Sequence, residues 1–277
     1  EYDLSLLQKQ FSKAALYIKE IEKKAQNNLS LTSDLASFCF KTGEIDKGID
    51  YLNAAISYFP FEPSLWHSKV DVYYQLMGNN FNNGDYEKAE EYLLKGLNVI
   101  NEAKEINKRN MNPFVFNKNT VELLQKMKFM QDNWDTNAIN DVNEIVHYSI
   151  FDLDVNNNGI PDQWGIINKE IMEAFVNNGK LVCKTEDNTY IYTTANYYVS
   201  LKKGKVYQIE VQLKESVNYL SYYFSGITQY AIPLNQEGNK YTAEILIDKE
   251  PSDIGNQFRI FMDSNCIIEH VIIKEKS

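Results

Sequence analysis

The sequence is poor in residues on which several common functions depend. Its 277 residues include three cysteines, and only two of its 28 basic residues, Arg109 and Arg259, are arginines. The arginine fork that nucleic-acid-binding proteins favour is nearly absent, and the net charge of −10 repels a polyanion, so we expect no nucleic-acid partner. Cys39, Cys183 and Cys266 lie far apart without a Cys-x-x-Cys pair, so we expect no zinc site and at most one disulfide.

Signals for membrane spans and for catalysis are also missing. No apolar run approaches the roughly 18 residues that span a bilayer, and no signal peptide opens the sequence. The chain begins at Glu1 and not at methionine, so we expect a fragment that meets a membrane only through a segment outside it. The histidines, His67, His147 and His270, accompany no Gly-x-Ser-x-Gly elbow and no phosphate loop, so we expect no enzyme activity.

The residues that are present indicate a folded chain with two kinds of structure. Apolar residues make up 44% of the chain and aromatic residues 13%, as in ordinary globular proteins. Helix-forming residues dominate as far as Asn133, and a strand-like period of two begins at Lys180. We therefore predict a multidomain α plus β protein with a helical domain (1–135), a linker (136–169) and an antiparallel β-sandwich of jelly-roll type (170–277).

The helical region fits a repeat of about 34 residues. Gly43 marks a turn between two helices, and small and large apolar residues recur along both. The residues that carry this pattern are Leu35, Ala36 and Cys39 before the turn and Gly48, Leu52 and Ala55 after it. This pattern resembles a tetratricopeptide repeat, and the resemblance implies an all-α solenoid that binds peptides or proteins.

Further units are predicted on both sides of this hairpin. A second unit opens with Trp66 and Tyr73, carries about seven extra residues, and resumes after the turn at Gly84. Val121 to Trp134 is predicted to be a terminal helix. The alternative is that these aromatic residues only fill a core and that the region is a spacer. The second unit resumes at Ala89, Leu93 and Gly96, and an upstream helix would carry Phe11, Ala14, Ile18 and Ile21.

An acidic loop separates the two halves of the chain. Oxygen-bearing side chains occur at every second position from Asp152, and Gly159 permits a sharp turn, a pattern that suits a hard cation with six to eight oxygen ligands. With Asp154 as position one the run resembles the start of an EF-hand-type loop, although Gly165 replaces the glutamate of position twelve. The predicted ligands of a structural Ca²⁺ are Asp152, Asp154, Asn156, Asn158, the Ile160 carbonyl and Asp162.

Two interpretations of this loop remain open. The run is similar to the thrombospondin type 3-like loops that precede sugar-binding or adhesion modules in bacterial surface proteins, which implies an extracellular or cell-surface location. The alternative is an asparagine-rich linker whose Asx turns need no ion.

The second half alternates apolar and polar residues in short runs. Val206 to Leu213 is the clearest predicted strand. Eight short strands with glycine, asparagine and aspartate turns favour an antiparallel sandwich. The other predicted strands are Lys180–Thr185, Thr189–Thr194, Tyr197–Leu201, Tyr219–Ser225, Lys240–Ile247, Gln257–Met262 and Cys266–Lys274.

The runs around Val199 to Tyr207, Arg259 and the final strand resemble bacterial carbohydrate-binding modules. That resemblance implies glycan binding through aromatic rings that stack on sugars. Ten tyrosines lie in this half, among them Tyr190, Tyr192, Tyr197 and Tyr198, and many of them are expected to be ordinary strand residues. The predicted ligand-binding residues are Tyr219, Tyr222, Tyr223 and Tyr230.

One resemblance covers the whole chain. The repeats, with Leu-Asn-Ala-Ala-Ile-Ser-Tyr-Phe-Pro at 52–60, are similar to the soluble tails of bacterial O-antigen ligase or polymerase-like membrane proteins. The first hypothesis is a non-catalytic surface region that binds protein partners through the helices and a glycan through the sandwich. The second is a structural or assembly adaptor that binds no sugar, and an enzyme with an unrecognised site ranks third.

Overall fold

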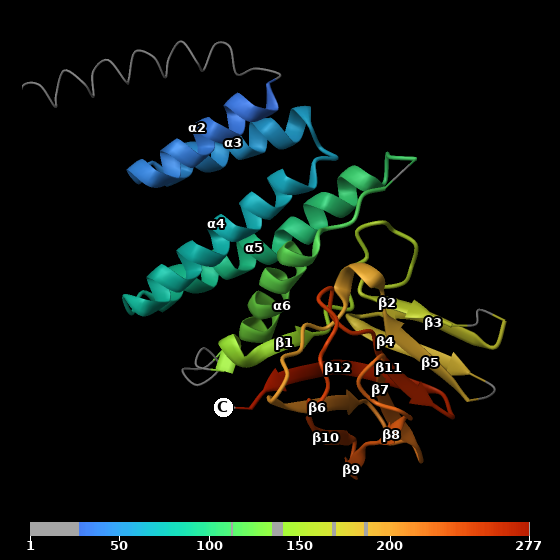
Figure 1. The fold of residues 1–277 in the computed structure, drawn as a ribbon. Coiled ribbons are helices and arrows are strands. Elements are labelled where there is room, and N and C mark those ends of the chain that lie inside the picture. The colour runs from blue at the N-terminus through green and yellow to red at the C-terminus, as the bar shows by residue number, and fades with distance from the viewer. Residues whose placement is uncertain (1–27, 112, 135–140, 168–169, 186–187, 277) are drawn as a thin grey trace, which may run out of the picture. The chain divides into compact units, whose positions relative to one another are not determined.

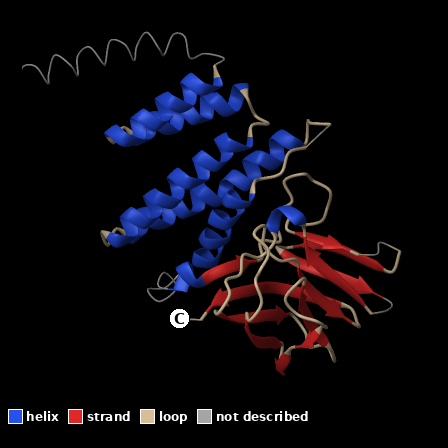
Figure 2. Ribbon diagram, in the orientation of Figure 1, coloured by secondary structure: helices blue, strands red, loops and turns tan. Residues whose placement is uncertain are grey.

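The computed structural model describes residues 28–111, 113–134, 141–167, 170–185 and 188–276 (Figure 1). Helices occupy the N-terminal part of these residues and strands the C-terminal part, as predicted (Figure 2). The contacts divide the chain into two compact units, Glu1–Lys69 and Val70–Ser277. This division differs from the predicted boundary at residue 135, because the last helices pack with the strands. No helix among the described residues is long and apolar enough to cross a membrane.

The first unit contains a helical hairpin formed by α2 (Leu29–Thr42) and α3 (Ile45–Tyr58). Gly43 makes the turn with a φ of 82°, a conformation that favours glycine. A Cβ at Gly48 would lie 2.3 Å from the Phe40 ring, so glycine allows the two helices to approach closely. The six residues predicted to face the hairpin interface, Leu35, Ala36, Cys39, Gly48, Leu52 and Ala55, are all buried. The predicted upstream helix with Phe11, Ala14, Ile18 and Ile21 lies outside the described residues.

Three further helices follow: α4 (Pro63–Asn82), α5 (Tyr86–Asn107) and α6 (Lys118–Asp132). The extra residues predicted before the turn at Gly84 extend α4 to Asn82. Asp85 caps α5 by accepting a hydrogen bond from the Lys88 backbone N–H. Gly96 of α5 lies against Met127 of α6 and Tyr73 of α4. The predicted terminal helix is confirmed as α6.

The strands form two antiparallel sheets that pack face to face, which confirms the predicted β-sandwich. The first sheet has β1 (Ile145–Tyr148), β3 (Met172–Asn177), β4 (Lys180–Thr185), β6 (Val206–Leu213), β9 (Asn235–Glu237), β10 (Lys240–Leu246) and β12 (Cys266–Glu275). Its order is β3-β4-β12-β6-β10-β9, and β1 also pairs with β12. The second sheet has the order β2-β5-β11-β7-β8, with β2 (Trp164–Ile166), β5 (Thr189–Thr193), β7 (Leu220–Phe224), β8 (Ile232–Pro233) and β11 (Phe258–Met262).

Alternation along the strands builds the core. In β6 the inward residues Tyr207, Ile209, Val211 and Leu213 are fully buried, and the residues between them are partly exposed. Residues of both sheets meet in one cluster of apolar side chains. Each sheet therefore has one face in the core and one outer face.

Two predicted segments differ from the structure. Tyr197–Leu201 is not a strand: Ala195–Tyr197 forms a 3₁₀ turn, and only Val199 makes an isolated bridge, to Asn256. The segment 136–169 supplies β1 to one sheet and β2 to the other, so it is an integral part of the sandwich.

Candidate functional site

The outer face of the five-stranded sheet carries a group of aromatic residues around one arginine. Arg259 of β11 is paired with Tyr192 of β5 and with Tyr223 of β7. Phe261, two residues further along β11, is paired with Tyr190. All five side chains are partly exposed, whereas their sequence neighbours on these strands point into the core. We call Tyr190, Tyr192, Tyr223, Arg259 and Phe261 the aromatic face.

The guanidinium of Arg259 lies between two rings of the aromatic face. Its Cζ is 4.9 Å from the ring centroid of Tyr190 and 5.1 Å from that of Tyr223, both within cation–π range. Its Nε donates to Oε1 of Gln257 at 2.7 Å, and Nη1 donates to the Tyr190 hydroxyl at 3.4 Å. An arginine has five N–H groups, and these two bonds hold the fork in a fixed plane while other donors remain.

The rings contact one another and the neighbouring strand. The centroids of Tyr190 and Phe261 are 4.7 Å apart, and those of Tyr190 and Tyr192 are 6.2 Å apart. The Tyr192 ring lies on Gly165 of β2, where a Cβ would come within 2.6 Å of the ring. Gly165 therefore gives the Tyr192 ring room to lie against the sheet.

This arrangement suits a ligand with flat apolar faces and polar edges. Aromatic rings offer large rigid surfaces at a low cost in conformational entropy. Arg259 can donate hydrogen bonds to oxygens at the edge of such a ligand. The aromatic face follows the sheet across β5, β11 and β7, whose neighbouring strands lie about 4.8 Å apart, so it favours an extended ligand over a compact one.

The structure separates the four tyrosines that the sequence predicts as ligand-binding residues. Tyr223 belongs to the aromatic face, while Tyr219 and Tyr230 are 40% and 72% exposed. Tyr222 corrects the prediction: it is only 1% exposed and packs against Phe224 and Phe258 in the core, where it cannot stack on a ligand. Burial raises the pKa of Tyr222 to about 12.

The sequence did not single out the other members of the aromatic face as a site. Tyr190, Tyr192 and Phe261 occupy alternate positions of their strands, each between two buried residues. Strand alternation in two predicted segments was therefore a usable signal. What the sequence lacked was the order β5-β11-β7, which brings these residues together.

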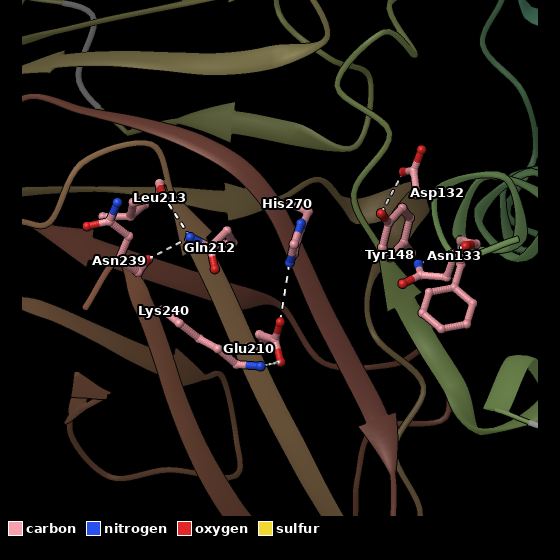
Figure 3. A network of polar contacts seen from close by, with 10 residues as sticks. Asp132, Asn133, Tyr148, Glu210, Gln212, Leu213, Asn239, Lys240 and His270 are labelled. Atoms are coloured by element: carbon pink, nitrogen blue, oxygen red, sulfur yellow. Dashed lines mark hydrogen bonds and ion pairs between the residues drawn. The ribbon is translucent and has the colours of Figure 1, made fainter. Parts of the chain in front are cut away.

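The outer face of the seven-stranded sheet is charged instead (Figure 3). Glu210 of β6 contacts His270 Nε2 of β12 at 3.3 Å and Lys240 Nζ of β10 at 2.6 Å. The hydrogen bonds from His270 and Lys240 lower the pKa of Glu210 to about 2 against its partial burial. The Tyr148 ring stacks on His270 with centroids 6.2 Å apart, and its hydroxyl donates to Asp132 of α6 at 2.7 Å.

The acidic loop folds as a chain of side-chain to backbone hydrogen bonds. Asp154 accepts from the backbone N–H groups of Asn158 and Gly159 at 3.0 and 2.9 Å. Asn156 Oδ1 also accepts from the Asn158 N–H, and Asn158 Oδ1 accepts from the Ile160 N–H. These bonds bring Asp154, Asn156, Asn158 and Ile160 into one turn.

Asp162 closes the turn, whereas Asp152 lies outside it. Asp162 accepts from the Val155 N–H at 3.0 Å and from the Asn156 amide, and burial raises its pKa to about 7. Asp152 is exposed, and its carboxylate lies beside Gly179. In the part of the chain that the structure describes, no three His, Cys, Asp or Glu side chains converge to hold a metal. A cation in this loop would depend on amide and backbone oxygens beside Asp154 and Asp162.

Comparisons with known proteins give structural likenesses to half of the chain. No family model matches the sequence, and no curated protein matches it. The apo structure of BiXyn10A CBM1 is similar over 48% of this chain and 99% of its own, with 16% identity and a TM-score of 0.35. The CBM22-1-GH10 modules of Clostridium thermocellum xylanase 10B with xylohexaose are 18% identical over 48% of this chain and 29% of theirs, with a TM-score of 0.34. The low affinity xylan binding module CBM86 from Roseburia intestinalis is 13% identical over 47% of this chain and 95% of its own, with a TM-score of 0.31.

Proposed function

We propose that the sandwich is a non-catalytic glycan-binding module and that the aromatic face is its binding surface. The observation that carries this proposal is the placement of four aromatic rings and one stacked arginine at outward positions of three adjacent strands. These side chains are not needed to fill the core, which the inward residues already form.

The chemistry of the aromatic face fits a sugar chain. A pyranose ring has a face of C–H groups that packs on aromatic rings and an edge of hydroxyls that accept hydrogen bonds from Arg259. The net charge of −10 disfavours strongly anionic polymers. We therefore propose a neutral polysaccharide as the ligand class.

Affinity electrophoresis and calorimetry with soluble xylan, mixed-linkage β-glucan and galactomannan test this proposal. We expect at least one polymer to retard the full chain, and the variants Tyr190→Ala and Tyr223→Ala to lose that retardation. Tyr58→Ala, at an exposed tyrosine of the helical hairpin, is the matched control. Tyr219→Ala and Tyr230→Ala test the alternative tyrosines. Loss of binding in these two, with binding kept in Tyr190→Ala and Tyr223→Ala, would move the site off the aromatic face.

The helical hairpin of the first unit favours a second role. Phe38 and Tyr58 of the hairpin and Phe61, three residues after its last helix, are 40 to 51% exposed. Exposed aromatic residues are common in protein interfaces. We propose that this unit contacts a protein or peptide, as the tetratricopeptide resemblance implies. If no glycan binds, the chain is a structural adaptor. The resemblance to O-antigen ligase-like tails stays a prediction.

Calcium binding by the acidic loop also stays a prediction, and its residues fit the ion in type. The Asp154 and Asp162 carboxylates and the Asn156 and Asn158 amides are oxygen donors, and each side chain keeps lone pairs beyond the hydrogen bonds described. The raised pKa of Asp162 marks a buried carboxyl whose charge a cation would stabilise. Bound Ca²⁺ would fix the loop between β1 and β2, and we propose an extracellular or cell-surface location on this basis.

A further inference from the structure

Two cysteines face each other across neighbouring strands of the sandwich. Cys183 of β4 and Cys266 of β12 are direct partners in the antiparallel register. Residues opposite each other in such a pair have Cα atoms about 4.5 to 5.5 Å apart, within the range of about 4.4 to 6.8 Å that a disulfide spans. Both side chains point into the core, and the Cys266 thiol donates to Met262 Sδ at 3.6 Å. The pair is thus placed for a covalent bond without movement of the backbone.

A cavity gives a small oxidant access to this pair. It has a volume of about 330 Å³ and is lined by both cysteines, by Lys184 and by the segment that starts at Lys214. Cys266 is 6% exposed and Cys183 is fully buried. The hydrogen bond with Cys266 and burial raise the pKa of Cys183, which keeps that thiol protonated. Cys266 is therefore the thiol that meets a reagent first.

We propose that Cys183 and Cys266 form an intramolecular disulfide, with a small-molecule disulfide as the oxidant. The Cys266 thiolate attacks one sulfur of the oxidant and expels a thiolate, which leaves a mixed disulfide. Cys183 then loses its proton, attacks Cys266 Sγ and expels the second thiolate. The two thiols lose two protons and two electrons in total, and the oxidant leaves as two reduced thiols. This proposal does not depend on glycan binding.

The position of the bond gives it a structural effect. β4 is joined to the rest of the sheet by a ladder of three residue pairs with β12, from Cys183–Cys266 to Leu181–Ile268. Among the described strands β3 pairs only with β4, so the β3–β4 hairpin is attached to the sheet through this short ladder. A disulfide at the end of the ladder would hold the hairpin on the sheet when the hydrogen bonds open.

Thiol counting on the full chain tests the proposal. The protein is incubated with oxidised glutathione, denatured, alkylated with iodoacetamide and digested for mass spectrometry. We expect one alkylated cysteine, Cys39, together with a peptide pair that joins Cys183 to Cys266, and three alkylated cysteines after reduction. The oxidised protein should melt roughly 5 to 15 °C above the reduced protein.

Single variants separate this bond from other oxidation products. Cys39→Ser should keep both the linked peptide pair and the melting shift, and Cys183→Ser should lose both. If Cys183→Ser does not fold, the peptide map of the wild-type chain decides alone. Three alkylated cysteines after prolonged oxidation, or a linked peptide that contains Cys39, would overturn the proposal.

Discussion

The two sheets of the sandwich are alike inside and different outside. On both, inward residues such as Ile209 and Ile260 are fully buried. Outward residues on the seven-stranded sheet form ion pairs, as at Glu210, whereas outward residues on the five-stranded sheet form the aromatic face. Surface ion pairs contribute only about 0 to 1 kcal/mol and keep a sheet face soluble. A partly exposed aromatic group has no such role, so the five-stranded sheet is the one whose outer face is built for contact with a ligand.

The largest expected difference between an inward and an outward residue concerns two neighbouring tyrosines on β7. Tyr222 points into the core and Tyr223 belongs to the aromatic face. We expect Tyr222→Ala to lower the free energy of unfolding by about 3 to 5 kcal/mol, because it leaves a cavity in the core. Tyr223→Ala should cost less than about 1 kcal/mol. Urea unfolding measures both, with Tyr222→Phe as the volume-matched control. Equal losses in the two alanine variants would mean that the aromatic face serves stability alone.

Inward and outward titratable groups of the seven-stranded sheet should respond to pH in different ranges. Burial lowers the pKa of His147, an inward residue of β1, to about 3, while the outer residue Glu210 has its pKa lowered to about 2. Below pH 6.5 His147 is protonated in the unfolded chain but stays neutral in the native protein. The contribution of His147 to the free energy of unfolding therefore falls as the pH drops. Glu210 loses its contribution only below its ordinary pKa of 4.5.

Unfolding free energies at pH 6.5 and pH 5 test this difference. The difference in unfolding free energy between wild type and His147→Gln should shrink by about 1.6 kcal/mol over this range, and the difference for Glu210→Gln should change by less than about 0.2 kcal/mol. Variants are needed because Asp162 has the opposite effect. Its pKa is raised to about 7 in the native protein, so its protonation stabilises the wild type as the pH falls and masks the loss of stability caused by His147. A pH-independent His147→Gln gap would contradict a buried neutral imidazole.

Local patterns in the sequence predicted the elements but not their neighbours. The strands Lys180–Thr185 and Val206–Leu213 have the predicted bounds. In the second strand apolar and polar residues alternate from Tyr207 to Leu213, while the first is a short apolar run between polar residues. The β1 segment was predicted as linker, since four residues beside an asparagine-rich loop show too little periodicity. Its pairing with β12, about 125 residues away, is set by packing that no local window contains.

The candidate site follows the same rule. Tyr223 was predicted because tyrosines cluster around it, and Tyr222 was included because strand alternation alone does not say which of two adjacent tyrosines faces the core. Arg259 and Tyr190 are 69 positions apart in the sequence and meet only through the β5–β11 register. The sequence therefore indicated that tyrosines form the site but not which residues belong to it.

Arg259 tests whether the outer faces differ in binding as well as in composition. We expect Arg259→Lys to lower the affinity for the polysaccharide that binds the wild type by about tenfold. Lysine lacks the planar fork that stacks between Tyr190 and Tyr223. Lys240→Ala on the opposite sheet is the matched control and should leave the affinity unchanged. Calorimetry with that polysaccharide measures both variants. A similar loss in Lys240→Ala would place the ligand on the charged face instead.

The smallest expected effect concerns the loop that connects the two sheets. With a dissociation constant near 1 mM, typical of extracellular modules, 10 mM Ca²⁺ should stabilise the chain by about 1.4 kcal/mol. Asp154→Ala should abolish that gain, because Asp154 anchors the turn through two backbone N–H groups. Asp152→Ala is the control that the structure offers, since Asp152 lies outside the turn and its loss should leave the gain intact. Thermal unfolding with Ca²⁺ and with chelator measures the shift. If neither heat of binding nor a shift is found, the turn is held by its Asx hydrogen bonds alone, and the argument for an extracellular location loses its basis.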